Sequence, residues 1–244
     1  MGRTIALVYG AISYLLFFAT FLYSIGFVGN QVVPKAIDSG VSGNIFDAIV
    51  LNVALLSIFA VQHSIMARPG FKAWWTRIIS KAVERSTFVL LTSLILALIF
   101  WKWQPMGDIV WSVENQIGVI ALWTIFGIGW LVVLVSTFMI NHFDLFGLTQ
   151  VYDNFKGRES SPPKFMVLGL YKVVRHPIML GFIIAFWATP VMTMGHLLFA
   201  AVTTTYILLS LSLLEERDLV AELGDAYTDY QSRVPMIFPT GSKK

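Results

Sequence analysis

Two short polar segments near the carboxyl end of the chain carry residue types that could do chemistry. Arg175-His176-Pro177 precedes one apolar run, and Glu215-Glu216 follows the next. Proline is favoured at the first position of a helix, and the residue before it is displaced from helical geometry. His176 is therefore expected beside the free N–H groups of a helix start, a place that favours anions such as carboxylates. An ordinary helix start with a basic membrane anchor would give the same pattern.

The second segment places a carboxylate on an apolar surface. Residues 215–233 are predicted to be helical, and at 100° per residue Glu216 falls on the stripe that also holds Leu219, Tyr227 and Tyr230. A carboxylate in apolar surroundings needs a partner such as an arginine, a hydroxyl or a cationic ligand. The wheel therefore predicts that Glu216 turns inward toward Arg175-His176, whereas the alternative is a charged cap that ends a membrane span.

Two further polar clusters stand where apolar segments end. His142 and Asp144 could pair as a base and its orienting carboxylate, although such residues are also common helix caps. His63 could line a substrate pocket or be a satisfied interfacial histidine. The sequence has no cysteine, no His-x-x-x-His pair and no glycine-rich phosphate loop, so no metal site is predicted.

The composition indicates the elements that must position these residues. Of the 244 residues, 57% are hydrophobic and 13% are charged, whereas a soluble domain has about 25% charged residues. The first apolar segment is too long for the apolar core of a signal peptide. The net charge is +3, and no basic run points to a nucleic-acid partner. The chain is therefore predicted to be a multi-pass membrane protein in contact with lipid, with no obligate protein partner evident.

The expected fold is all-α: a single polytopic helical bundle over residues 1–244. An amphipathic helix is expected over residues 67–85 and a carboxyl-terminal helix over 215–233, with cofactor-binding elements in 141–176 and 215–239. Each span is near the ~20 residues that cross a ~30 Å hydrocarbon core. The six expected spans are 4–28, 45–66, 86–103, 116–140, 177–192 and 195–214.

The basic residues predict the orientation. Lys and Arg number five after the second span, five after the fourth and four after the sixth, whereas the alternate loops have one, one and none. Because basic loops stay cytoplasmic, both termini and every polar cluster are expected on the cytoplasmic side of the cell (inner) membrane. The connection at 192–196 is very short, so the last two spans should form a hairpin that joins Arg175-His176 to Glu215-Glu216.

Residues 171–239 resemble, in order and spacing, the isoprenylcysteine carboxyl methyltransferase superfamily of integral membrane enzymes. The matching residues are Arg175-His176-Pro177, Gly181, Glu215-Glu216, Leu219, Gly224, Tyr227, Tyr230 and Val234-Pro235. One departure is Met179, which stands where the superfamily usually has tyrosine. The resemblance implies S-adenosylmethionine as cofactor, with S-adenosylhomocysteine as product.

The rest of the chain is similar to a narrower group, the bacterial methanethiol S-methyltransferases. This resemblance implies methylation of methanethiol, a small volatile thiol, to dimethyl sulfide. The segments that carry it are Gln62-His63-Ser64, Met66-Ala67-Arg68-Pro69, Glu84-Arg85-Ser86-Thr87, Asn141 to Leu148, Gln150, Phe186 to Pro190 and Met192-Thr193.

The resemblance also implies roles for the polar clusters. The cofactor-binding residues would be Tyr171, Arg175, His176, Pro177, Gly181, Glu215, Glu216, Tyr227 and Tyr230. Candidates for the group that removes the thiol proton are His176, His142 (held by Asp144) and His63. Because the resemblance gives His176 to the cofactor, this role is expected to fall to His142 or Asp144. The substrate pocket would hold His63, Asn141, Phe143, Phe146 and Trp187.

Three other functions fit parts of the pattern. One is a methyltransferase for a larger lipid-borne substrate, of the isoprenylcysteine or phospholipid type, which the match in the first 150 residues disfavours. Another is a non-enzymatic membrane sensor of the same superfamily. A transporter is the third, but no inverted repeat and no charged residue in the middle of a span supports it.

Overall fold

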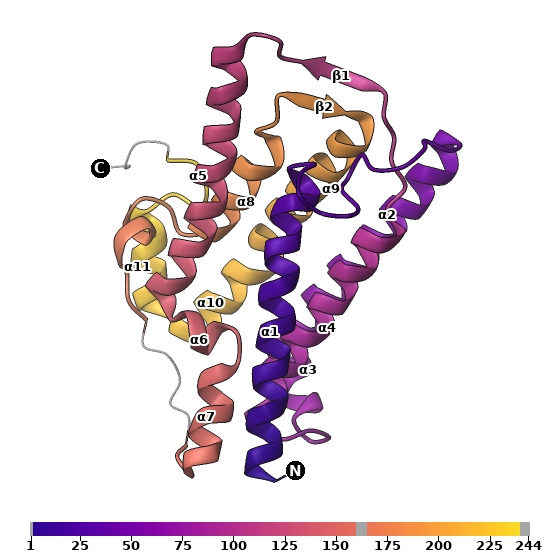
Figure 1. Ribbon diagram of the computed structural model, residues 1–244. Coiled ribbons are helices and arrows are strands. Elements are labelled where there is room, and N and C mark those ends of the chain that lie inside the picture. Colours follow the sequence, from indigo (N-terminus) through magenta and orange to yellow (C-terminus); the bar gives the residue numbers. More distant parts are fainter. Residues whose placement is uncertain (1, 160–164, 240–244) are drawn as a thin grey trace.

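The computed structural model describes residues 2–159 and 165–239, and helices dominate it. Within that part of the chain, five helices are long and apolar enough to cross a membrane (Figure 1). They are α1 (Arg3–Val28), α2 (Ile45–Ala67), α4 (Lys81–Lys102), α5 (Gln116–Ile140) and the continuous helix Met194–Leu223. The last of these comprises α9 (Met194–Ser210), η2 (Leu211–Glu215) and α10 (Glu216–Leu223). The predicted all-α multi-pass membrane bundle is confirmed.

Four of the long helices begin at side-chain caps, which explains their sharp starts. Thr193 caps the helix Met194–Leu223 by accepting from the backbone N–H of His196. Asn44 accepts from the backbone N–H groups of Phe46 and Asp47 at the start of α2. Ser80 caps α4 and Asn115 caps α5 in the same way. Each cap satisfies N–H groups that no earlier turn of the helix can pair.

The expected span 177–192 is too long. The helix there, α8 (Pro177–Trp187), has 11 residues, which is roughly 16 Å at 1.5 Å per residue. Pro190 cannot continue a helix and disfavours helical geometry in Thr189. The chain instead forms β2 (Val191–Thr193), which pairs antiparallel with β1 (Ile109–Ser112), a strand pair that the sequence did not predict. The connection between the last two apolar helices is short, but it spans residues 188–193 rather than the expected 192–196, and His196 lies within α9.

Two other predicted helices are divided in the structure. The expected amphipathic helix 67–85 is only α3 (Pro69–Trp75), because Ser80 caps α4 and its residues from Lys81 onward belong to the span. The segment 215–233 breaks between α10 and α11 (Asp225–Arg233). Gly224 has φ 58° there, a conformation that glycine adopts without strain.

Glycines bring α5 and α8 into close contact. A Cβ atom added to Gly181 would lie 2.7 Å from the carbonyl oxygen of Gly129, and one added to Gly129 would lie 2.7 Å from the backbone nitrogen of Ala185. Small residues allow such backbone approach between membrane helices. The contact fixes α8 closely against α5.

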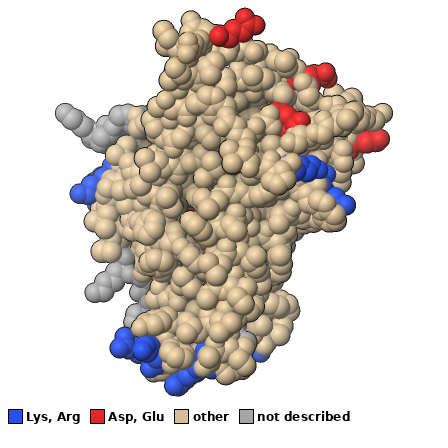
Figure 2. All heavy atoms as spheres, in the orientation of Figure 1, with Lys and Arg blue, Asp and Glu red and all other residues tan. Residues whose placement is uncertain are grey.

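The ends of the bundle differ in charge. Figure 2 shows Lys and Arg side chains gathered at the end that holds α3, α7 (Leu148–Lys156) and the amino terminus. Asp and Glu side chains lie toward the opposite end on this face, where some Lys and Arg side chains also lie, and the middle of this face is almost free of charge. This uncharged middle is the surface expected of a protein whose helices contact lipid.

Candidate active site

The start of α8 is anchored by the carboxyl-terminal segment. The backbone N–H of Arg175 donates to the carbonyl oxygen of Pro235 (2.9 Å), and that of His176 donates to Met236 (3.1 Å). Pro177 occupies the first helical position, and His176 precedes it with non-helical φ and ψ, as the sequence predicts. No side chain caps this helix among the described residues, so its first N–H groups remain available to an anion.

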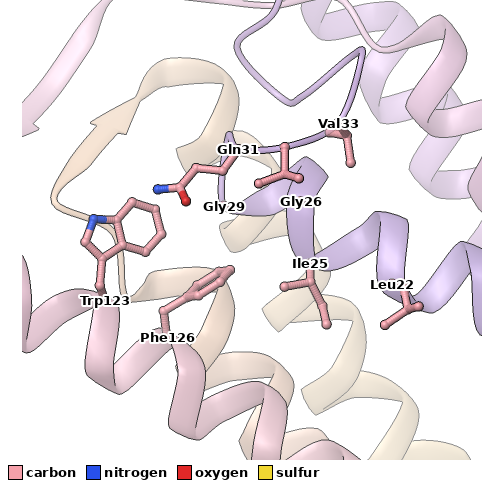
Figure 3. Close-up of a pocket in the computed structure, with 9 residues that line it drawn as sticks. Leu22, Ile25, Gly26, Gly29, Gln31, Val33, Trp123 and Phe126 are labelled. Carbon is pink, nitrogen blue, oxygen red and sulfur yellow. The ribbon is translucent and has the colours of Figure 1, made fainter.

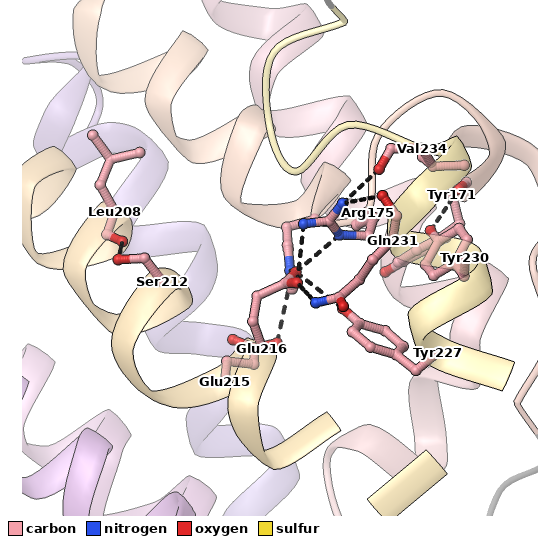
Figure 4. A network of polar contacts seen from close by, with 11 residues as sticks. Tyr171, Arg175, Leu208, Ser212, Glu215, Glu216, Tyr227, Tyr230, Gln231 and Val234 are labelled. Atoms are coloured by element: carbon pink, nitrogen blue, oxygen red, sulfur yellow. Dashed lines mark hydrogen bonds and ion pairs between the residues drawn. The ribbon is translucent and has the colours of Figure 1, made fainter. Parts of the chain in front are cut away.

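Glu216 is the centre of a buried polar network (Figure 4). The Arg175 guanidinium binds it with two parallel hydrogen bonds, Nε to Oε1 at 3.0 Å and Nη2 to Oε2 at 2.9 Å. His176 Nε2 lies 2.5 Å from Oε1, the Tyr227 hydroxyl donates to Oε1 at 3.0 Å, and Gln231 donates to Oε2. These donors satisfy both carboxylate oxygens. The predicted inward orientation of Glu216 is confirmed, with Arg175 as its bidentate partner.

The remaining Arg175 nitrogen joins the network to the end of α11. Its Nη1 donates to the carbonyl oxygens of Val234 (2.6 Å) and Gln231 (3.2 Å). The Tyr230 hydroxyl donates to the carbonyl oxygen of Tyr171 (2.6 Å) in η1 (Gly169–Lys172). One ion pair thus ties together η1, α8, α10 and α11, and we name residues 175, 176, 216, 227 and 231 the carboxylate clamp.

His176 is held in its charged form by the two glutamates. Its Nδ1 is 3.5 Å from Glu215 Oε1, on the ring edge opposite Glu216. Burial alone would lower the pKa of His176, but the hydrogen bonds to Glu215 and Glu216 outweigh it and raise the pKa to about 9. Burial and the nearby Glu216 also raise the pKa of Tyr227, so its hydroxyl acts as a donor at neutral pH.

A π-helical turn separates the roles of the two adjacent glutamates. η2 ends at Glu215, and single π turns within α-helices are frequent at functional sites. The Glu215 side chain is 39% exposed and the Glu216 side chain 9% exposed. Glu215 therefore carries the accessible carboxylate of the pair.

Gly181, a predicted cofactor residue, and Met179 both make packing contacts in the structure. The group that approaches Gly181 is α5 itself, through Gly129 and Val133. Met179, at the position of the superfamily's tyrosine, packs against the apolar cluster of Ile207, Leu211 and Ile237. Both residues support the start of α8 from beneath the clamp.

His142 lies in α6 (His142–Leu145) and uses both ring nitrogens. Nδ1 is 2.8 Å from the hydroxyl of Thr137, which itself donates to the Leu134 carbonyl, so Nδ1–H is the donor. Nε2 then accepts from the Tyr14 hydroxyl at 2.9 Å. The ring stacks on Phe138, and burial lowers the pKa of His142. These contacts describe a neutral histidine that joins α1, α5 and α6.

Asp144 is oriented away from that histidine's partners. Its carboxylate accepts from Gln150 (3.1 Å), and burial raises its pKa. Asn141 adopts φ 140° and caps α6 through its side chain. Phe146 stacks on Phe17 of α1, with ring centroids 3.8 Å apart. The structure thus brings the predicted members of this segment together as the joint between α5, α6 and α1, without pairing His142 with Asp144.

His63 has the opposite kind of environment. Its ring lies between Phe59 (5.2 Å between centroids) and Phe88 (5.0 Å). Its Nδ1 is buried and has no hydrogen-bond partner among the described residues. A buried polar atom left unpaired costs about 1–3 kcal/mol, so it calls for a reason.

Two predicted pocket residues lie apart from these groups. The Trp187 indole, at the end of α8, donates to Thr204 (2.9 Å). Phe143 is 49% exposed beside Phe138. Neither contacts the carboxylate clamp through a ring or polar interaction in the described part of the chain.

A cavity of about 540 Å³ lies elsewhere, between the end of α1 and the start of α5 (Figure 3). Trp123, Phe126 and Ile25 form its apolar walls, and Gln31 contributes the polar side chain. It includes none of the predicted site residues.

Sequence reasoning missed three residues that complete the polar groups. Gln231 follows Tyr227 by four residues and so shares its helix face, a spacing that could have revealed it. Tyr14 and Thr137 gave no such signal, since Tyr14 is 128 residues from His142 in the sequence. No cluster of three or more His, Asp or Glu side chains suited to a metal occurs in the described residues.

Fold and site together define a multi-pass membrane protein with a buried arginine–histidine–glutamate network at one end of its helices. Among known proteins, the model of a family described as NnrU protein matches residues 51–217. A methanethiol S-methyltransferase of Mycobacterium tuberculosis is 54% identical over 98% of each chain, and one of Crocosphaera subtropica is 50% identical over 100% of this chain and 95% of its own. The chain therefore belongs to the NnrU family and to the family of the methanethiol S-methyltransferases.

A more distant relative lies outside the bacteria. Nurim of Mus musculus is 28% identical over 72% of this chain and 70% of its own. No solved structure matches the chain. The bacterial methyltransferases, which align along nearly the whole sequence, carry the functional comparison.

Proposed function

We propose that this protein methylates methanethiol to dimethyl sulfide, with S-adenosylmethionine as the methyl donor and S-adenosylhomocysteine as the second product. The observation that carries the proposal is the 50–54% identity, over almost the whole chain, to proteins named for that activity. The arrangement of the clamp is compatible with it, because an accessible carboxylate and an uncapped helix start lie beside each other.

The residues present fit the chemical groups of this donor. The uncapped start of α8 suits its carboxylate, and Glu215 suits its cationic groups. Phe165 lies at 6.0 Å from Tyr227 and 5.6 Å from Tyr230, and this partly exposed aromatic group suits a purine ring. Bound there, the donor would supply a methyl group already activated by its sulfonium.

Within this proposal, the predicted cofactor residues have two kinds of role. Glu215 and the start of α8 face the donor. Arg175, His176, Glu216 and Tyr227 keep those elements in place, since their polar atoms are already occupied by one another. The clamp thus supports binding by fixing geometry rather than by offering free hydrogen bonds.

The protein must also remove the proton of a thiol that is mostly undissociated at neutral pH. His142 or Asp144 stays a prediction for this role. The bonds of His142 to Thr137 and Tyr14 weigh against it, because they leave both nitrogens engaged. Asp144→Asn provides the matching test: a carboxylate base would lose turnover about 100-fold or more, whereas a capping carboxylate would lose little.

The charge distribution supports a cytoplasmic site in the cell membrane. The Lys and Arg gathered around α3, α7 and the amino terminus favour that end as cytoplasmic (Figure 2). Of the basic residues that predict this orientation, Lys164, Lys243 and Lys244 lie outside the described residues. An apolar thiol would reach the site from the bilayer, and the charged donor would reach it from the cytoplasm.

The decisive experiment is headspace gas analysis of membranes that contain the protein, supplied with methanethiol and S-adenosylmethionine. We expect dimethyl sulfide in amounts that depend on both compounds. Membranes from the same host without the protein are the control. Binding of S-adenosylhomocysteine without any dimethyl sulfide would instead indicate a methyltransferase for another substrate, or a sensor.

A further inference from the structure

The seam between α2 and the helix α9–η2–α10 opens toward the charged end of the molecule. The hydroxyls of Ser64 and Tyr206 are 3.0 Å apart, and Arg68 pairs with Asp218 at 2.7 Å. The two contacts are four residues apart along α2 (64 to 68) but twelve residues apart along the other helix (206 to 218). At 1.5 Å per residue the two advances differ by roughly 12 Å, so the helices diverge and the long Arg68 side chain spans the opening.

His63 and Glu215 belong to the two walls of this seam. His63 precedes Ser64 on α2, and Glu215 ends the π turn between Tyr206 and Asp218. The two side chains interact electrostatically, and Arg85 and Arg68 also act on the His63 ring. Glu215 in turn lies 3.5 Å from His176 Nδ1. The seam is therefore where His63 adjoins the carboxylate clamp.

A small cavity lies about one helical turn further into the membrane along the same seam. Its volume is about 60 Å³, and Ala60, Phe59, Val202 and Tyr206 are among its walls. A cavity of 10–15 Å³ on this measure holds one water molecule, so 60 Å³ suits a solute of only a few heavy atoms. Two of its lining residues reach the polar groups of the seam: Phe59 packs on the His63 ring, and the Tyr206 hydroxyl bonds to that of Ser64.

We infer that the α2–α9 seam is the thiol subsite, in which the cavity admits a one-carbon thiol from the bilayer and His63 accepts its proton. This inference rests on the proposed function. The buried Nδ1 without a partner is the observation that points to a ligand, since a thiol supplies the missing hydrogen bond. In the transfer, the S–H proton passes to His63 and the thiol sulfur forms a bond to the donor's methyl carbon. The methyl–sulfonium bond breaks, and its electron pair stays on the donor's sulfur.

Glu215 has a defined part in this step. Proton acceptance makes His63 cationic in a place enclosed by Phe59 and Phe88, where an isolated charge is costly. The negative charge of Glu215 favours the cationic form, whereas burial of the ring and the charges of Arg85 and Arg68 oppose it. Glu215 is therefore the group of the seam that assists proton acceptance by His63.

His63→Phe tests the inference because phenylalanine keeps the packing between Phe59 and Phe88 and removes only the nitrogens. We expect turnover of methanethiol at pH 7 to fall at least about 100-fold. The melting temperature and the affinity for S-adenosylhomocysteine should stay at their wild-type values, because no hydrogen bond of Nδ1 is lost. The deficit should shrink as pH rises and more thiolate is present in solution. A His63→Phe protein with wild-type turnover would overturn the inference.

Ala60→Leu fills the cavity and tests whether the cavity admits the thiol. We expect the KM for methanethiol to rise by about tenfold or more, with the affinity for S-adenosylhomocysteine unchanged. Ala54→Leu, on the exposed side of the same helix, is the matched control and should behave as wild type. An unchanged KM in Ala60→Leu would show that the cavity is not the subsite. If the wild-type protein forms no dimethyl sulfide at all, the proposed function itself fails. That outcome differs from failure of the subsite inference, in which the wild type and both variants are equally active.

Discussion

The carboxylate clamp and His63 differ in how completely their polar atoms are paired. In the clamp, Arg175 and Glu216 are bonded at every nitrogen and oxygen. His63 has a buried nitrogen that finds no hydrogen-bond partner in the part of the chain that the structure describes. A buried network that is fully satisfied fixes a structure, whereas an unpaired buried atom is tolerated where a ligand completes it. The difference supports the proposal that the most conspicuous sequence motif builds the site and that a less conspicuous histidine faces the substrate.

The largest effect should follow Glu216→Ala. It leaves the Arg175 guanidinium and the charged His176 buried without their carboxylate, a loss of about 3–5 kcal/mol of stability. Thermal unfolding of the purified protein in detergent measures it. Asp229→Ala is the control, since it breaks an ion pair with Arg233 whose side chains are 62% and 68% exposed, and such pairs contribute about 0–1 kcal/mol. A Glu216→Ala melting temperature equal to that of the control would refute the structural role.

The clamp should also make stability depend on pH. The pKa of His176 is raised to about 9 in the folded protein, against 6.5 for a free histidine. The contribution of charged His176 to the free energy of unfolding is therefore fully present below pH 6.5 and is lost as pH rises through 9. This contribution is on the order of 3 kcal/mol in all. Melting temperatures from pH 6 to 9.5 should fall across this window in the wild type. His176→Gln should show a flatter profile, and parallel profiles would remove His176 as the cause.

Much of this architecture follows from the sequence because hydrocarbon leaves few alternatives. Long apolar segments must be helical to pair their backbone groups, so the four spans from α1 to α5 begin or end within a few residues of the predicted positions. The prediction failed where one residue redirected the chain, as at Pro190 after α8 or Gly224 between α10 and α11. Such breaks depend on tertiary contacts as much as on composition.

The site divides in the same way. Pairing of Arg175 with Glu216 was predictable, because the apolar stripe and the short connection after α8 both brought them together. The partners of His142 were not, since Tyr14 comes from the first helix and Asp144 turns to Gln150 instead. The unpaired state of His63 depends on Phe59, Phe88 and their neighbours, which no local pattern reveals.

Gly181→Ala should have an intermediate effect that separates position from binding in the clamp. Its Cβ atom would lie 2.7–2.8 Å from backbone and side-chain atoms of Gly129 and Val133, so α8 must shift away from α5. Overpacking of this kind costs about 1–3 kcal/mol. Thermal unfolding measures the loss, with Gly127→Ala as control because open space surrounds that position on α5. Equal melting temperatures would mean that the close α5–α8 contact adds no stability.

The smallest expected change in stability gives the sharpest contrast between paired and unpaired histidines. His142→Phe removes the hydrogen bonds to Thr137 and Tyr14 and should lower stability by about 1–2 kcal/mol. His63→Phe removes no bond of Nδ1 and should leave stability unchanged or slightly higher. Turnover, measured at a temperature where both proteins are folded, should fall much more in His63→Phe than in His142→Phe. If His142→Phe instead loses turnover as fully as His63→Phe and keeps its stability, then His142 is also part of the proton path, and hydrogen-bond pairing does not distinguish a structural histidine from a reactive one in this protein.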